Sequence, residues 1–188
     1  MDNIKLTILK FDILKKTASE ISLADLTTAA HDPHIVYWCH CDYSQLDPCI
    51  DMVKKLRLDE AVIDYLHDTS TLPQLNDTDD SLTIKIQAPQ YILPDKKKHI
   101  EYSSLIIHLT THICFTFANK PIYALGEFLK QSEKSLRYAK TPGFILFLVL
   151  DNVLNDYAKI LLGLESHCDE LDAHLRTYTQ KNHFRKRF

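Results

Sequence analysis

Three residues of types that often bind metal ions follow one another at Cys39, His40 and Cys41. The residues around them are β-branched and aromatic, which predicts a buried strand. Successive side chains of a strand point to opposite faces, so Cys39 and Cys41 would share one face and His40 would lie on the other. Two thiols could bind a soft ion such as zinc, but Cys-x-Cys lacks the ligand spacing of a structural zinc site. Free cysteines are among the most buried residue types, and we therefore predict thiols packed in a core.

Histidine is abundant, with 10 residues in a chain of 188. His108 and His112 flank a predicted turn, and His167 and His174 lie two helical turns apart on a predicted helix. Two turns separate the imidazoles by roughly 10 Å, which is too far for them to share one ion. Scattered imidazoles are more often surface groups, so we favour that interpretation over a transition-metal site.

The sequence lacks the common catalytic signatures, among them a glycine-rich phosphate loop, G-x-S-x-G and H-E-x-x-H. The formal net charge of -3 gives no basic field for nucleic acid. Five cysteines without framework spacing are typical of reduced thiols in a cytoplasmic setting. The longest apolar run, Phe144 to Leu150, is far shorter than the ~20 residues that cross a bilayer. We expect a soluble stretch of chain that is not an enzyme and does not bind nucleic acid.

Strand and helix patterns alternate along the chain and predict an α/β fold. Strands are predicted at 3–11, 35–42, 81–88, 101–109 and 112–117, and helices at 22–30, 45–56, 59–67 and 122–138. Thr141 and Pro142 then suit the N-cap and the first turn of a long helix. We therefore expect a mixed β-sheet layered with α-helices at 1–140, followed by a long C-terminal stalk helix at 141–188.

The long helix carries apolar residues at alternating spacings of three and four. This heptad seam consists of Phe147, Leu150, Leu154, Tyr157, Leu161, Leu164, Cys168, Leu171, Leu175 and Tyr178. A straight helix drifts by ~20° per heptad relative to a 3.5-residue repeat, so a seam of this length predicts supercoiling against a partner helix. The spacing leaves open whether the partner belongs to the same chain or to another.

Several stretches together resemble the CorA-type divalent cation transporters. Residues 36–66 are similar to a strand with a tryptophan, here Trp38, followed by two helices, and Pro73 matches a proline in the next loop. Residues 105–121 are similar to a strand pair of the family. The closest resemblance is at 142–175, which reads PGFILFLVLDNVLNDYAKILLGLESHCDELDAHL.

The sequence departs from the family pattern at three places. Leu72 and Gln74 stand where the family usually has a basic pair, and Tyr65 stands where it has a second aspartate. The two transmembrane helices and their Gly-Met-Asn loop are not in this sequence. We therefore expect the excised N-terminal cytoplasmic domain of a membrane transporter, rather than a soluble relative.

The resemblance implies a regulatory Mg²⁺ site between the domains of neighbouring protomers, held by carboxylates. By position, these carboxylates fall on Asp64 and Asp151. The resemblance also implies a homo-oligomer, a pentamer in the full-length family, at the cytoplasmic face of the bacterial inner membrane. A zinc-transporting member of the same family, with Zn²⁺ in place of Mg²⁺, and a soluble coiled-coil interaction protein without transport activity remain as alternatives.

Overall fold

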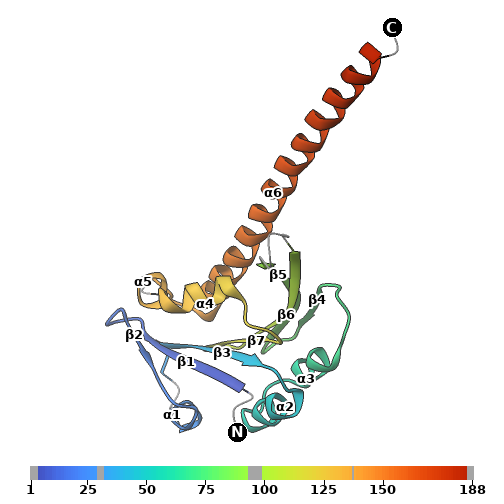
Figure 1. Ribbon diagram of the computed structural model, residues 1–188. Helices are drawn as coiled ribbons and strands as arrows, with labels where there is room; N and C mark the ends of the chain where they lie inside the picture. Colours follow the sequence, from blue (N-terminus) through green and yellow to red (C-terminus); the bar gives the residue numbers. More distant parts are fainter. Residues whose placement is uncertain (1–3, 29–31, 93–98, 137, 186–188) are drawn as a thin grey trace. The chain divides into compact units, whose positions relative to one another are not determined.

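The computed structural model describes residues 4–28, 32–92, 99–136 and 138–185, and their side chains except those of 90–92, 99, 132–133 and 176–185. Strands and helices alternate along this part of the chain (Figure 1). They are β1 (Ile4–Asp12), β2 (Thr17–Glu20), α1 (Leu23–Thr28), β3 (Ile35–Tyr43), α2 (Leu46–Lys55), α3 (Glu60–His67), β4 (Gln74–Asp77), β5 (Leu82–Ile92), β6 (His99–Leu109), β7 (Ile113–Ala118), α4 (Tyr123–Lys130), α5 (Ser132–Leu136) and α6 (Pro142–Arg185).

Seven strands of the described chain form one mixed sheet in the order β2-β1-β3-β7-β6-β5-β4. The central pair, β3 and β7, is parallel, and every other neighbouring pair is antiparallel. Strands in a parallel pair are covered on both faces, which explains why β3 reads as a continuous run of apolar residues instead of an alternating one. The predicted mixed sheet layered with helices and followed by a long helix is confirmed.

The chain leaves β3 and β7 towards opposite sides of the sheet. After β3 it forms α2 and α3 on one side, and after β7 it forms α4 and α5 on the other (Figure 1). We call these the first and the second face. The first face buries Tyr37, Cys39 and Phe115 against residues of α1, α2 and α3. On the second face, the rings of Trp38 and Phe128 pack at a tilt of 35° with centroids 4.8 Å apart.

The predicted elements differ from the structure at the sheet edges and after β7. The sequence pattern does not predict the edge strands β2 and β4, and β4 lies in a segment predicted as a loop. An edge strand is largely open to solvent, so hydrogen bonds to β1 and β5 suffice to order polar sequences such as Thr-Ala-Ser-Glu.

The single helix predicted at 122–138 is also wrong. Gln131 leaves the helical conformation at φ -103°, and its N–H is shared between the carbonyls of Glu127 and Phe128, which ends α4.

The long helix α6 begins as the sequence predicts. The N–H of Phe144 donates to Thr141 Oγ1 at 3.3 Å, and Pro142 occupies the first helical position, where its missing N–H costs nothing. The helix continues unbroken to Arg185.

Contacts divide the chain into two compact units, Met1–Val153 and Leu154–Phe188. Among the described helices, none is both long and apolar enough to cross a bilayer.

Candidate functional site

The first carboxylate of the implied metal site, Asp64, lies on α3. The helix is capped by Asp59, whose Oδ1 accepts the N–H of Ala61 at 2.9 Å. Val62 and Leu66 are buried beneath α3, and Asp64 is exposed on its outer side. An exposed carboxylate on a capped helix is held in a defined place while it stays accessible to an ion.

Tyr65, which replaces the second aspartate of the family pattern, is partly buried beside Asp64. Burial, and to a smaller extent the charge of Asp68, raises the pKa of Tyr65 above its ordinary value. The phenol therefore stays neutral at physiological pH. It does not replace the anionic oxygen that an aspartate would supply to a cation.

The second carboxylate, Asp151, is exposed on α6. It lies in the same compact unit as Asp64, but α3 and the start of α6 lie on opposite sides of the sheet (Figure 1). Within the described residues, no three His, Cys, Asp or Glu side chains come together as a metal-binding group. A site that uses Asp64 and Asp151 would have to combine carboxylates of two chains, and it stays a prediction.

Burial of the thiols of Cys39 and Cys41 is confirmed. Both side chains belong to the apolar cluster of the first face, with exposed fractions of 2% and 1%, and Cys49 of α2 lies in the same cluster. Burial raises the pKa of Cys39, and a hydrogen bond with Cys49, together with burial, raises that of Cys41. The thiolate is the form that attacks electrophiles and binds metals. These thiols are core side chains that remain protonated.

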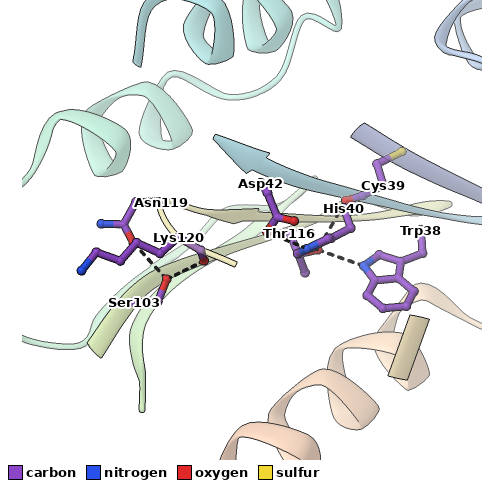
Figure 2. A network of polar contacts seen from close by, with 8 residues as sticks. All are labelled: Trp38, Cys39, His40, Asp42, Ser103, Thr116, Asn119 and Lys120. Carbon is purple, nitrogen blue, oxygen red and sulfur yellow. Dashed lines mark hydrogen bonds and ion pairs between the residues drawn. The ribbon is translucent and has the colours of Figure 1, made fainter. Parts of the chain in front are cut away.

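His40 lies on the second face, as the alternation of the strand predicts, and it belongs to a buried polar network (Figure 2). Its Nδ1 is 2.8 Å from Thr116 Oγ1, and its Nε2 is 3.2 Å from Asp42 Oδ1. The indole N–H of Trp38 donates to the same Thr116 oxygen at 3.0 Å. The Thr116 hydroxyl also lies 3.5 Å from the carbonyl of Cys39. A single hydroxyl therefore joins two buried rings of β3 to β7.

This network is satisfied with either charge state of His40. When the imidazole is neutral with its proton on Nε2, the Thr116 hydroxyl donates to Nδ1 and Nε2–H donates to Asp42. When the imidazole is protonated, Nδ1–H donates to Thr116, whose own hydrogen turns to the carbonyl of Cys39. Trp38 keeps its acceptor in both arrangements. Each donor of the network therefore has an acceptor in both hydrogen-bond arrangements.

A second polar contact fixes the chain between β7 and α4 (Figure 2). The buried Ser103 hydroxyl is 3.0 Å from Asn119 Oδ1 and 2.9 Å from the carbonyl oxygen of Lys120. The same Asn119 oxygen accepts the N–H of Ser104 at 2.9 Å. These bonds hold the connection that leads from the sheet to α4.

A cavity of about 530 Å³ lies between α4 and the ends of β1 and β3, next to His40 and Asp42. Lys5 lies on its wall, together with Glu127 and Lys130, which form an ion pair at 2.7 Å. In open α/β sheets, ligands bind outside the carboxyl ends of parallel strands whose connections leave in opposite directions. The described geometry matches that rule, although both ring nitrogens of His40 are already hydrogen bonded within the protein.

Sequence reasoning found His40 but not Trp38 and Thr116 as its partners. The signal was present in part, because a threonine inside the apolar run of β7 is a polar group that needs a partner when buried. The pairing itself depends on the register that places His40 opposite Thr116, 76 residues away. A strand pattern gives the faces of a strand but not its neighbour.

The comparisons with known proteins agree on one family. The model of a family described as "CorA-like Mg2+ transporter protein" matches residues 34–188. A curated relative, the cobalt/magnesium transport protein CorA of Methanocaldococcus jannaschii, is 21% identical over 163 residues, which make up 85% of this chain and 47% of the relative. The chain therefore spans about half the length of the curated relative that it matches.

Solved structures show the same fold. The complete structure of the CorA magnesium transporter from Methanocaldococcus jannaschii has a TM-score of 0.67 at 17% identity, over 93% of this chain and 52% of that one. The ZntB cytoplasmic domain from Vibrio parahaemolyticus has a TM-score of 0.61 at 16% identity, over 86% of this chain and 63% of that one. At these identities the likeness concerns the fold.

Proposed function

Because the chain belongs to the CorA-like Mg2+ transporter family, we propose that it is the cytoplasmic regulatory part of a transporter for magnesium or another divalent cation. The observation that carries this proposal is the family match over residues 34–188, which includes most of the sheet and the whole of α6. We further propose that it works at the cytoplasmic face of the bacterial inner membrane, joined to membrane-spanning segments beyond Phe188.

The heptad seam of α6 supports a homo-oligomer. Its large apolar side chains are exposed at Phe147 (58%), Leu154 (63%), Leu161 (64%), Leu164 (48%), Leu171 (51%) and Leu175 (65%). Tyr178 lies outside the described side chains. A stripe of exposed leucines in heptad register is typical of a helix that packs against further helices. We propose that these come from other copies of the chain, five in all as in the full-length family.

Asp64 and Asp151 have the chemistry that a regulatory Mg²⁺ needs. Mg²⁺ takes oxygen ligands, keeps several waters and is often held by only one or two protein carboxylates. Both side chains are exposed carboxylates on helices. With Tyr65 neutral, two carboxylates and water would form the site, and its affinity would be lower than that of a site with three.

Regulation would follow from charge. Acidic surfaces of neighbouring copies repel one another unless a cation neutralises them, so a bound ion favours one arrangement of the copies over another. We propose that Mg²⁺ between Asp64 and Asp151 of neighbouring copies stabilises the closed transporter. Loss of the ion would then release the domains.

The test measures the oligomeric fraction of the chain by analytical ultracentrifugation, with and without millimolar Mg²⁺. We expect Mg²⁺ to increase that fraction and to raise the thermal unfolding midpoint. The variants Asp64→Asn and Asp151→Asn should lose the increase, because each removes one anionic ligand. Asp79→Asn, which changes an exposed carboxylate of the β4–β5 turn, is the matched control and should respond like the parent.

If both site variants respond to Mg²⁺ as the parent does, the assignment of the two carboxylates is wrong. Transport itself is tested separately, by Mg²⁺ uptake into vesicles that contain the complete protein. A complete protein that associates through its helix but takes up no divalent cation would favour the alternative of a coiled-coil interaction protein.

The zinc-transporting alternative predicts a different ion preference at the same protein. Calorimetric titration with Zn²⁺ and with Mg²⁺ separates the two. Tighter binding of Zn²⁺ that is lost in Asp64→Asn and Asp151→Asn would favour zinc. The thiols of Cys39 and Cys41 lie in the apolar cluster of the first face with exposed fractions of 2% and 1%, so they are not accessible to an ion held by the exposed Asp64 and Asp151.

A further inference from the structure

A second cavity of the Met1–Val153 unit lies away from the network of His40. It has a volume of about 770 Å³ and is open to one side of the first face, where the β6–β7 turn meets α1 and the α2–α3 connection. Small-molecule sites typically measure about 300–1,000 Å³ and combine apolar walls with a few placed polar groups. This cavity has that size and that composition.

His108 is the buried polar group of the cavity. Its side chain is 1% exposed, and Nδ1 lies 2.9 Å from the hydroxyl of the buried Thr83. Nε2 has no hydrogen-bond partner among the described residues. His108 is among the residues that line the cavity, and Nε2 is the ring nitrogen that remains available to a ligand. The neighbouring ring of Phe115 lies with its centroid 6.1 Å from that of His108.

The walls and the rim of the cavity differ in character. Leu26, Leu58 and Phe115 provide apolar wall, whereas Lys55 and Arg57 place two exposed cations on the rim. Neither cation forms an ion pair within the described residues. An unpaired lysine and arginine at the mouth of an apolar cavity suit an anionic group, phosphate above all.

Two acidic side chains, Asp59 and Asp80, also line the cavity. Both carboxylate oxygens of Asp59 already accept hydrogen bonds within the protein. Oδ1 accepts the N–H of Ala61 at 2.9 Å, and Oδ2 accepts the Ser81 hydroxyl at 3.2 Å. Asp80 is exposed at the rim, and its carboxylate suits the hydroxyl groups of a sugar. The cavity therefore offers separate places for an apolar ring, a hydroxylated linker and an anion.

We propose that this cavity binds a small organic phosphate that carries a flat heterocyclic ring, of the nucleoside monophosphate class. The ring lies against Phe115 and the leucines, with His108 Nε2 hydrogen bonded to a ring heteroatom. The phosphate lies between Lys55 and Arg57. The binding site requires neither cation transport nor the Asp64–Asp151 pairing, so its test is independent of the proposed function.

The experiment titrates the whole chain with AMP by isothermal calorimetry, with adenosine and inorganic phosphate as separate titrants. AMP should bind more tightly than either of its parts, because only AMP occupies both the walls and the rim. Arg57→Gln and Lys55→Gln should each weaken AMP binding by about tenfold, the loss of one charge-assisted contact, and leave adenosine binding unchanged. Lys54→Gln, the neighbouring exposed lysine that does not line the cavity, is the control.

His108→Gln should weaken AMP and adenosine alike, because it removes the contact to the ring. Arg57 and Lys55 are exposed, so their variants should unfold at the parent's temperature, and the test does not depend on whether His108→Gln folds. The proposal is overturned if AMP gives no binding heat at millimolar concentration. It is overturned equally if inorganic phosphate binds as tightly as AMP, or if Lys54→Gln weakens AMP as much as Arg57→Gln does.

Discussion

Two apolar stripes of α6 meet opposite environments. Ile145, Val149 and Val153 are buried, with exposed fractions of 0%, 0% and 3%, whereas Phe147 and Leu154 of the heptad seam are 58% and 63% exposed. Successive residues of a helix are about 100° apart, so Phe147 points away from the side on which Ile145 and Val149 lie. Both stripes consist of ordinary core residues. Apolar character shows that a side chain needs a partner, and position within the fold decides whether that partner belongs to the same chain.

The largest expected effect comes from placing a charge in the buried stripe. Val149→Asp would enclose an unpaired carboxylate and should lower the free energy of unfolding by more than about 3 kcal/mol. At a protein concentration low enough to keep the chain monomeric, Leu154→Asp places the same charge on the exposed seam and should change the free energy of unfolding by at most about 0.5 kcal/mol. Urea unfolding can be followed by the fluorescence of Trp38, the single tryptophan, which is 1% exposed. If both variants lose the same free energy of unfolding, the two stripes do not differ in burial.

The next effect concerns association through the seam. Leu161→Lys combined with Leu171→Lys should convert associated protein to monomer, because like charges would face one another across the packed helices. The unfolding of the α/β unit, followed through Trp38 at low protein concentration, should stay within about 0.5 kcal/mol of the parent. Leu162→Lys is the control, since Leu162 is 65% exposed but lies off the seam. If the double variant sediments like the parent, the seam is not the self-association surface.

A third prediction tests whether the loss of a buried hydrogen-bonding group in the sheet lowers stability as the gain of a buried charge in α6 does. Thr116→Val would remove the acceptor of the Trp38 indole and one partner of His40, and should cost about 1–3 kcal/mol. Thr7→Val on β1 is the control, because Thr7 lies opposite His40 in the sheet and has no hydrogen bond of its side chain among the described residues. We expect a change below about 0.5 kcal/mol for Thr7→Val. A similar cost for both variants would mean that the effect of Thr116→Val is one of shape and not of hydrogen bonding.

Much of this arrangement follows from local pattern. The apolar run of β3, the apolar faces of α2 and α3, and the Thr141–Pro142 start of α6 are all local features, and each is in the structure. The sequence pattern does not predict the edge strands β2 and β4, because their conformation depends on hydrogen bonds to the neighbouring strands β1 and β5. The contacts of His40 and Thr116, and those of Asp59 and Ser81, likewise depend on register between distant segments. The proposed pairing of Asp64 with Asp151 would need a second chain, so no local pattern can establish it.

The smallest expected effect comes from comparing a buried histidine, His108, with an exposed one, His67. Burial lowers the pKa of His108 below its ordinary value of 6.5, against a smaller opposing effect of Asp59. In the window between the folded pKa and 6.5, the unfolded chain binds more protons than the folded one, so stability falls as the pH falls through that window. Measured by urea unfolding, the free energy of unfolding of the parent should therefore decline from pH 7.5 to pH 5. The decline should be shallower in His108→Gln than in the parent. His67→Gln, at an exposed position of α3, should keep the slope of the parent. If His108→Gln keeps that slope too, the imidazole of His108 takes up its proton as readily in the folded protein as in the unfolded chain, and the enclosure of its ring is less complete than the structure indicates.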